Sequence, residues 1–346
     1  MRAVVFDAVG SVRVEDVPDP TIEDPSDAVI RVTRSAICGS DLHFLHGKAP
    51  IAPGEGIGHE AVGVVEVVGP DVRRFSPGDR VVVSFVIACG ACWFCLRGQT
   101  QLCEDFRNLG AGAFGGGLPG AQAERLRVPI ADVNLLGIPP AVGDEAALFV
   151  GDVLTTGWYA ASSAGISAGD TVAVVGLGPV GHCAVQAALA MSPEQVLAVD
   201  RDPARLALAA AVGAVPVDAT ARHPVTAVAE ATAGRGADVV LEAVGHPDAF
   251  ETAADLARRG GTVVVVGMYA GETVPIQLGV WWARAMQLRF SGICPVHAWW
   301  EASMAELAAG RLDPTPLISH RLPLEEAPHG YRLFDRREAT KVLLLP

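Results

Sequence analysis

Short runs of alternating apolar and polar residues fill the first half of the chain. The segments 27–37, 61–69 and 79–86 read DAVIRVTRSAI, AVGVVEVVG and DRVVVSFV, and turn sequences such as SPGD and GP separate them. Alternation with a period of two is typical of strands that bury one face, and Gly and Pro mark the turns between strands. This pattern predicts a barrel-like domain of short β-strands.

The pattern changes near residue 150. Beyond Thr171, almost uninterrupted apolar runs begin at residues 171, 196, 237 and 262, and Ala-rich segments with a helical period, such as 179–191 and 203–214, lie between them. Continuous apolar runs are typical of parallel strands that are covered on both faces. Because strands and helices alternate, we expect a doubly wound parallel sheet with right-handed crossovers, and therefore an α/β protein.

The last part of the chain returns to a mixed pattern. Residues 299–310 have the composition of a helix, and residues 340–346 read as a strand. We expect this segment to pack on the first domain. The predicted division is a first domain of residues 1–151 with 294–346 and a second domain of residues 152–293.

The composition excludes several classes of protein. Half of the 346 residues are hydrophobic, and the formal net charge of −13 argues against nucleic acid, because binding phosphates requires a basic face. No apolar run is long enough to predict a membrane span. The N-terminus lacks the basic start, apolar stretch and cleavage site of a secretory signal. We therefore expect a cytoplasmic protein with reduced thiols.

Four of the seven cysteines lie in the segment 89–103 with the spacing C-x2-C-x2-C-x7-C. They are Cys89, Cys92, Cys95 and Cys103. Two disulfides are an alternative in an oxidising compartment, but reduced thiols at these short spacings favour a closed tetrahedral zinc site. Four thiolates leave no coordination position for a substrate, so this zinc is expected to stabilise the loop and to take no part in chemistry.

A glycine-rich turn follows the apolar run at residues 171–175 and precedes a predicted helix. Its sequence, GLGPVG, carries the G-x-G-x-x-G pattern, in which glycines permit a tight turn, close approach to a pyrophosphate and close helix packing. The predicted cofactor-binding residues of this turn are Gly176, Gly178, Pro179, Val180 and Gly181.

The next apolar run ends at Asp200, where a carboxylate can accept hydrogen bonds from both ribose hydroxyls. The same carboxylate would repel the 2′-phosphate of NADP, so NAD is the favoured cofactor. Arg201 follows directly and could soften this preference. Arg205 could help to hold the adenosine ribose, or it could be a solvent-exposed helix charge.

A further set of chemical side chains lies in the β-rich half. The segments 38–43 and 58–60 read CGSDLH and GHE, and they supply a cysteine, two histidines and a carboxylate. Taken alone, these residues do not define a site, because single cysteines are usually core residues and single histidines usually surface or capping residues.

The order of motifs along the whole chain resembles the zinc-dependent medium-chain alcohol dehydrogenases. The motifs are CGSDLH, GHEAVGVVEVVG, PGDRVVV, the four-cysteine segment, GDVLTTGWYA and GLGPVG. The resemblance implies a GroES-like catalytic domain, a Rossmann coenzyme domain and a catalytic zinc in the cleft between them. The family's zinc ligands fall on Cys38, His59 and Asp152, and Glu60 matches a carboxylate that can bind or approach the metal. Asp152 is a departure, because many relatives have cysteine there; zinc accepts oxygen ligands, and a helix N-cap is the alternative role.

The resemblance also implies roles in catalysis. Ser40 and His43 match the positions that pass the proton of the alcohol towards solvent, and Thr156 matches the position beside the nicotinamide ring. Asp41 is the natural partner to orient His59.

The remaining cofactor contacts that the resemblance implies come from the C-terminal half. The backbone at Val266 and Gly267 is expected to hold the carboxamide, and Lys341 is expected to reach the pyrophosphate. Trp281 and Trp282 could line the substrate end, form a subunit contact or pack in the core.

The predicted function is reversible hydride transfer between a small primary or secondary alcohol and NAD, with two Zn²⁺ per chain. Polyol, amino-alcohol and formaldehyde dehydrogenases of the same superfamily are alternatives. A non-enzymatic redox sensor that binds a nucleotide is a further alternative. By analogy with relatives of similar length, we expect a homotetramer, with a dimer as the alternative.

Overall fold

The computed structural model describes residues 1–271 and 273–346, which divide into two compact units. The first unit contains residues 1–155 and 295–346, and the second contains residues 156–294. The predicted boundaries differ from this division by only a few residues. The difference matters for Asp152, which was predicted in the second domain and belongs to the first unit.

The first unit is built on a mixed seven-stranded sheet with the order β16-β17-β3-β4-β5-β9, and β8 also pairs with β3. Its strands are β3 Ala28–Ile37, β4 Glu60–Val68, β5 Arg80–Val83, β8 Arg125–Val128, β9 Leu135–Gly137, β16 Ile318–Pro323 and β17 Lys341–Leu345. Separate pairs are formed by β1 Arg2–Ala8 with β2 Ser11–Asp16, and by β6 Val86–Ile87 with β7 Arg107–Asn108. Alternate residues of β3, namely Ala28, Ile30 and Val32, face one apolar core, as the period of two predicts.

Short helices connect these strands. They are α1 Asp41–Leu45, α2 Ala131–Asn134, α3 Asp144–Ala147, α10 Val296–Ala308 and α11 Ala327–Asp335, and α4 Val153–Ala164 runs from this unit into the second. The 3₁₀ turns are η1 Cys95–Arg97, η2 Thr100–Leu102, η3 Gly112–Gly115, η4 Leu148–Gly151, η5 Thr315–Leu317 and η6 Leu324–Glu326.

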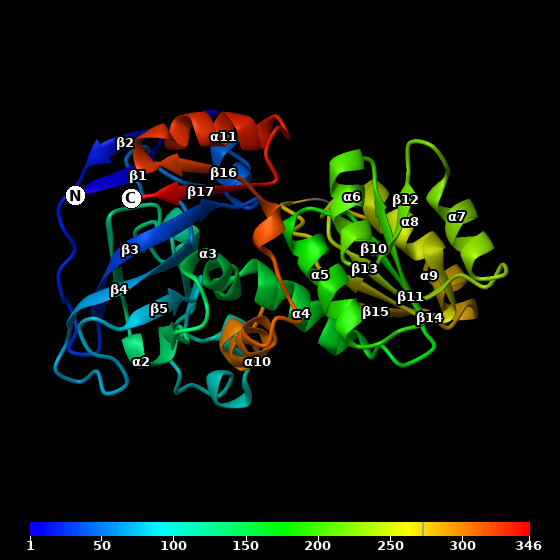
Figure 1. Cartoon of the computed structure of the whole chain (residues 1–346), viewed down its shortest axis with the longest axis horizontal. Coiled ribbons are helices and arrows are strands. Elements are labelled where there is room, and N and C mark those ends of the chain that lie inside the picture. Colours follow the sequence, from blue (N-terminus) through cyan, green and yellow to red (C-terminus); the bar gives the residue numbers. More distant parts are fainter. Residues whose placement is uncertain (272) are drawn as a thin grey trace. The chain divides into compact units, whose positions relative to one another are not determined.

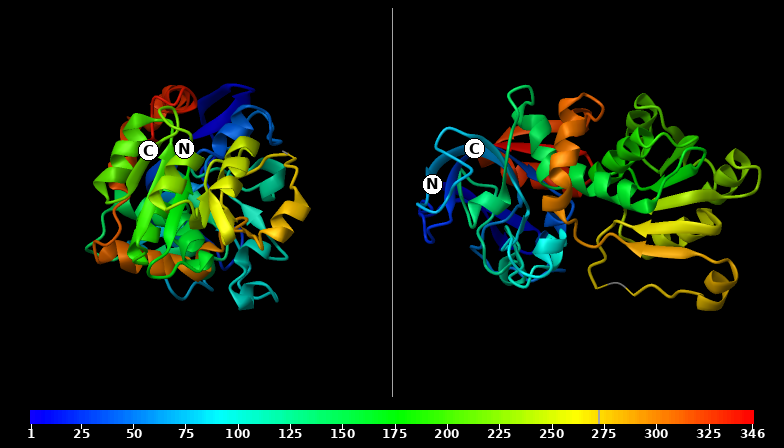
Figure 2. Two further views of the ribbon diagram at one scale, coloured as in Figure 1. Left: turned by 90° about the vertical axis from the view of Figure 1, so that its right-hand side faces the viewer. Right: turned by 90° about the horizontal axis from the view of Figure 1, so that it is seen from below.

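The C-terminal strand β17 lies inside the sheet of the first unit, between β16 and β3 (Figure 1). It pairs in parallel with β16 and antiparallel with β3. The two chain termini lie near each other on this unit in all three views (Figures 1 and 2). The prediction that the last segment packs on the first domain is confirmed.

The second unit is a six-stranded parallel sheet with the order β12-β11-β10-β13-β14-β15. The strands are β10 Thr171–Val175, β11 Gln195–Asp200, β12 Val215–Asp218, β13 Ala237–Glu242, β14 Ala257–Val265 and β15 Gln287–Phe290. The helices are α5 Pro179–Ala190, α6 Pro203–Ala211, α7 Pro224–Ala231, α8 Pro247–Leu256 and α9 Leu278–Ala283.

Both faces of this parallel sheet are covered. Val172 and Val174 of β10 pack in a core with α5 and α6, whereas Ala173 and Val175 pack in a second core with α7 and α8. Every residue of the central strand β10 is therefore buried, which explains its uninterrupted apolar run. The predicted doubly wound sheet is confirmed, and its order reverses beside β10, where such sheets bind nucleotides. Within the part of the chain that the structure describes, no helix is both long and apolar enough to cross a membrane.

Candidate metal centres and nucleotide site

Four side chains of the first unit converge in one buried cluster, which we call the reactive centre: Cys38, His59, Glu60 and Asp152. Their ligand atoms all lie within 4.8 Å of one another. Cys38 follows the end of β3 and His59 precedes the start of β4, and these strand ends meet because Ala36 pairs with Glu60. Asp152 Oδ2 lies 3.8 Å from Cys38 Sγ and 3.2 Å from His59 Nε2. The structure thus brings together the residues predicted to bind the catalytic zinc.

The reactive centre concentrates acidic groups away from water. Burial raises the pKa of the Cys38 thiol, and the Glu60 carboxylate raises it further. Burial also raises the pKa of Glu60, whose Oε2 atom has no hydrogen-bond partner among the described residues. Burial alone would lower the pKa of His59, but Asp41 and Cys38 raise it well above its usual range. Burial is the largest cause at each of the three groups, and the neighbouring carboxylates and thiolate add negative charge that a divalent cation would offset.

The donor atoms of the reactive centre fit Zn²⁺. A thiolate, an imidazole nitrogen and a carboxylate oxygen are accepted zinc ligands, and together they balance its charge. His59 Nδ1 lies 3.1 Å from Asp41 Oδ1, so the ring presents Nε2 to a metal. Asp152 Oδ2 faces both the sulfur and the imidazole, which is the position that a third ligand needs. The centre could therefore hold zinc.

Of the residues predicted to take part in catalysis, Ser40 contacts this centre. Ser40 precedes α1, and its Oγ lies 3.3 Å from His59 Nε2, the nitrogen that faces Asp152. His43 belongs to α1, and partial burial, with Lys48 and His46, lowers its pKa. Thr156 is buried in α4, one helical turn beyond Asp152.

Lys341 is buried in the sheet of the first unit, beside Glu60. This first residue of β17 is 0 % exposed, and its Nζ lies 2.5 Å from Glu60 Oε1. Its ammonium group also lies 5.8 Å from the centre of the Phe149 ring. In this structure the cation is enclosed by a carboxylate and an aromatic ring, and its contact with a pyrophosphate stays a prediction. Lys341 belongs to the surroundings of the reactive centre.

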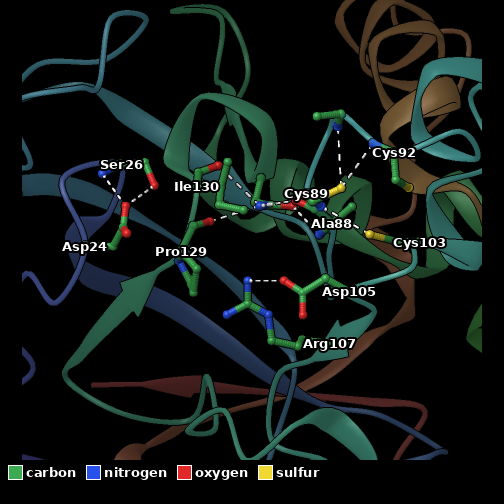
Figure 3. A network of polar contacts seen from close by, with 12 residues as sticks. Asp24, Ser26, Ala88, Cys89, Cys92, Cys103, Asp105, Arg107, Pro129 and Ile130 are labelled. Atoms are coloured by element: carbon green, nitrogen blue, oxygen red, sulfur yellow. Dashed lines mark hydrogen bonds and ion pairs between the residues drawn. The ribbon is translucent and has the colours of Figure 1, made fainter.

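The four cysteines of the segment 89–103 form a second candidate centre, which we call the four-cysteine centre. Their sulfurs all lie within 4.8 Å of one another, and Cys89 Sγ is 3.9 Å from Cys95 Sγ. Backbone N–H groups point at these sulfurs: Cys89 N donates to Cys103 Sγ, and Cys92 N donates to Cys89 Sγ, both over 3.3 Å (Figure 3). The backbone of Glu104, followed by that of Cys95, lowers the pKa of Cys92 to about 6. Sulfurs grouped around one point, with amides that favour thiolates, fit a tetrahedral zinc better than two disulfides.

A buried histidine that sequence reasoning did not single out ties this centre to the body of the unit. His297 Nδ1 lies 2.9 Å from the hydroxyl of Thr100, and His297 Nε2 lies 2.9 Å from Asn134 Oδ1. Burial lowers the pKa of His297 to about 4, so the ring is neutral. Because the amide oxygen of Asn134 only accepts, Nε2 donates to it and Nδ1 accepts from Thr100. Asn134 also bonds the backbone N–H and C=O of Ala88, next to Cys89 (Figure 3).

The glycine-rich turn of the second unit has the geometry that its sequence predicts. Gly176 has a φ of +88°, and a Cβ atom at Gly181 would lie 1.8 Å from Gly176 O. A Cβ at Gly178 would meet nothing within 4 Å, so that position faces open space in front of α5. Pro179 is the first residue of α5, whose unpaired N-terminal amides suit an anion. This open space at a helix N-terminus fits a pyrophosphate.

Asp200 ends β11 next to this turn. Its Oδ2 accepts a hydrogen bond from Leu177 N over 2.6 Å, and its Oδ1 accepts from Arg201 N over 2.7 Å. Arg201 is exposed, whereas Arg205 Nη1 lies 3.9 Å from Asp200 Oδ2. The carboxylate therefore stands at the carboxyl end of the sheet, where a carboxylate of this fold binds ribose hydroxyls.

The backbone N–H groups of Val266 and Gly267 already have hydrogen-bond partners within the second unit. Both N–H groups donate to the carbonyl oxygen of Glu242, over 2.8 and 2.9 Å. These N–H groups are therefore already hydrogen-bonded, and the contact with a carboxamide stays a prediction.

Comparison with known proteins agrees with this arrangement. Residues 24–140 match the alcohol dehydrogenase GroES-like domain, and residues 179–309 match the zinc-binding dehydrogenase domain. A probable zinc-binding alcohol dehydrogenase of Mycobacterium tuberculosis is 43% identical over 332 residues, which cover 96% of this chain and 84% of that protein.

Solved structures are similar over the same length. Alcohol dehydrogenase TADH from Thermus sp. ATN1 has a TM-score of 0.96 and 46% identity, and the match covers 100% of this chain and 99% of that one. A protein of Sinorhizobium meliloti 1021 assigned as a zinc-binding dehydrogenase, solved bound to NADP, has a TM-score of 0.87 and 32% identity, with coverage of 100% and 99%. The chain belongs to the zinc-dependent medium-chain dehydrogenases and is an oxidoreductase of the zinc-type alcohol dehydrogenase family.

Proposed function

We propose that this protein transfers hydride reversibly between a small primary or secondary alcohol and NAD, with one zinc in the reactive centre and one in the four-cysteine centre. The observation that carries the proposal is the convergence of Cys38, His59, Glu60 and Asp152 in one buried cluster beside Ser40. A zinc bound there would act as a Lewis acid that lowers the pKa of a coordinated alcohol, and the nicotinamide would accept the hydride.

The chain's own residues would hold the reactants and move the proton. Ser40 stands next to His59 Nε2, where it can accept the proton of an alcohol held beside Asp152. His43 lies on α1, which begins directly after Ser40, and its lowered pKa keeps it neutral at pH 7 and able to receive that proton. The burial of the centre limits access of water to the reacting atoms.

The preference for NAD rests on Asp200. Its carboxylate would accept from ribose hydroxyls and repel a 2′-phosphate. One solved relative is bound to NADP and another is described as an NAD-dependent alcohol dehydrogenase, so the ratio of kcat/KM for NAD and NADP is the test. We expect a clear preference for NAD, and equal values would refute this assignment.

The main experiment combines turnover with metal content. Mixing the protein, NAD and a panel of alcohols should produce NADH absorbance, and a strong chelator should abolish it. Elemental analysis should give two zinc per chain. Absence of turnover across the panel in protein that contains both metals would refute the proposed activity.

We also propose that the chain self-associates through the second unit. β15 is the outer strand of the parallel sheet, and Phe290, Trp282 and Leu278 at this edge are 70%, 83% and 77% exposed. Outer strands with exposed apolar side chains pair readily with a second copy. Trp281 instead stacks on Phe250 at 5.7 Å within the core. Light scattering should give the molar mass of a dimer or tetramer, and Phe290→Asp should shift the protein towards the monomer. A monomeric wild-type protein would contradict this proposal.

A further inference from the structure

Behind His59, on the side away from Asp152, lies a continuous line of buried polar side chains. Asp41 comes first, is 0 % exposed, and touches two residues of the reactive centre. Its Oδ1 lies 3.1 Å from His59 Nδ1, and its Oδ2 accepts a hydrogen bond from the backbone N–H of Cys38 over 2.9 Å. The orientation of this one carboxylate therefore affects two ligands at once.

Gln122 is the next member, and its amide fixes the second oxygen of Asp41. Gln122 Nε2 donates to Asp41 Oδ2 over 3.2 Å and to Ala36 O over 3.0 Å. The side chain is also tightly enclosed, because a Cβ atom at Gly58 would lie 2.4 Å from Gln122 Cγ. The backbone that leads into His59 thus lies directly against Gln122, and only glycine permits this contact.

Tyr331 closes the line from the C-terminal part of the chain. It lies in α11, is 2% exposed, and donates its O–H to Gln122 Oε1 over 3.0 Å. Because Oε1 accepts from Tyr331, the amide must present Nε2 to Asp41, and the flipped orientation would place two acceptors together. The ring packs in an apolar core with Ile37 and Ile57, which flank the strand ends of the reactive centre.

We propose that Gln122 and Tyr331 are positioning residues of the reactive centre. They hold Asp41 in the one orientation that keeps the proton on Nδ1 of His59 and leaves Nε2 as a metal ligand. The inference rests on the proposed function in that it assumes a metal in this centre. Partners of this kind that stand behind a metal-ligating histidine typically change metal affinity by roughly 10- to 100-fold when they are removed.

The test measures metal retention by the zinc-loaded protein, without substrate or coenzyme. Zinc release to a chromogenic chelator is followed over time for wild type, Gln122→Met and Tyr331→Phe. Each centre should release its zinc in its own kinetic phase, and the phase of the reactive centre is the one that is missing in Asp152→Ala. We expect Gln122→Met to accelerate this phase by about 10- to 100-fold and Tyr331→Phe to accelerate it less. The phase of the four-cysteine centre should keep its wild-type rate. The visible spectrum of cobalt bound in the reactive centre should change in both variants.

Ser303→Ala is the matched control, because Ser303 is a buried hydroxyl of the same unit that bonds Thr155 over 2.7 Å. It should leave both phases unchanged. Wild-type release rates in both Gln122→Met and Tyr331→Phe, or equal acceleration in Ser303→Ala, would overturn the positioning role. Should Gln122→Met fail to fold, Tyr331→Phe decides alone, because it keeps the ring and removes only the hydroxyl. If the variants behave as expected in a protein that oxidises no alcohol, only the proposed function fails.

Discussion

The ion pair between Lys341 and Glu60 gives the sharpest test of the electrostatics of the reactive centre. Both side chains are 0 % exposed, and the two charged atoms lie 2.5 Å apart. Replacing Lys341 with Met keeps most of the volume and leaves the Glu60 carboxylate buried without its cation. Removing one partner of a buried pair typically costs about 3–5 kcal/mol, because the remaining charge is not compensated. We therefore expect Lys341→Met to lower the free energy of unfolding of the metal-free protein by about that amount.

The assay is urea denaturation of the metal-free and zinc-loaded forms at pH 5 and pH 8. Burial already raises the pKa of Glu60 above its ordinary value of 4.5, and Lys341 counteracts this rise, so the pKa of Glu60 is higher still in Lys341→Met. When folding raises the pKa of a carboxyl group, the protein loses stability as the pH rises from the pKa of that group in the unfolded chain to its pKa in the folded protein. The penalty should therefore be larger at pH 8 than at pH 5. It should also be smaller with zinc, because the metal supplies positive charge.

The double variant Lys341→Met with Glu60→Gln is the control, because it removes both charges. It should regain most of the lost stability in the metal-free protein. A loss of less than about 1 kcal/mol in Lys341→Met, well under the range for a broken buried pair, would refute the reasoning. So would a double variant that is no more stable than Lys341→Met.

Four further outcomes follow from the same geometry. Asp152→Ala should lose one zinc per chain and all turnover while its thermal unfolding stays close to wild type, as elemental analysis and calorimetry can show; retention of both metals would contradict the ligand role. Cys95→Ser should lose the other zinc and unfold at a clearly lower temperature, and an unchanged unfolding temperature would show that this centre does not stabilise the fold. His43→Ala should lower kcat by about 10²-fold or more and remove the limb of the pH–rate profile that His43 sets, whereas an unchanged profile would exclude it from proton transfer. Asp200→Ala should raise kcat/KM for NADP relative to NAD, and a constant ratio would show that the carboxylate does not select the coenzyme.

Most of the strands and helices could be predicted from local patterns in the sequence. The strands at residues 171–175 and 196–200 are predictable because a strand buried on both faces must be apolar throughout. The turn at Gly176 is predictable because it requires a positive φ and a close approach that only glycine allows. Each of these requirements acts within a few residues of the chain.

The residues that the sequence did not reveal act over long separations. Gln122 meets Asp41 and Tyr331 across 81 and 209 residues, and no local spacing records either contact. The contact of Lys341 with Glu60 is another long-range case, because it spans 281 residues and depends on the pairing of the last strand with β3. The reactive centre itself became predictable only through its resemblance to a family, since Cys38 and Asp152 are separated by 114 residues.

The position of β17 has a consequence for biosynthesis. Since β17 occupies an interior place between β16 and β3, a nascent chain cannot complete its first sheet until residues 341–345 have left the ribosome. The second unit is one continuous segment, residues 156–294, so it can fold while synthesis continues. A variant that lacks residues 341–346 should therefore be retained by chaperones and degraded by proteases, because its first sheet lacks an interior strand.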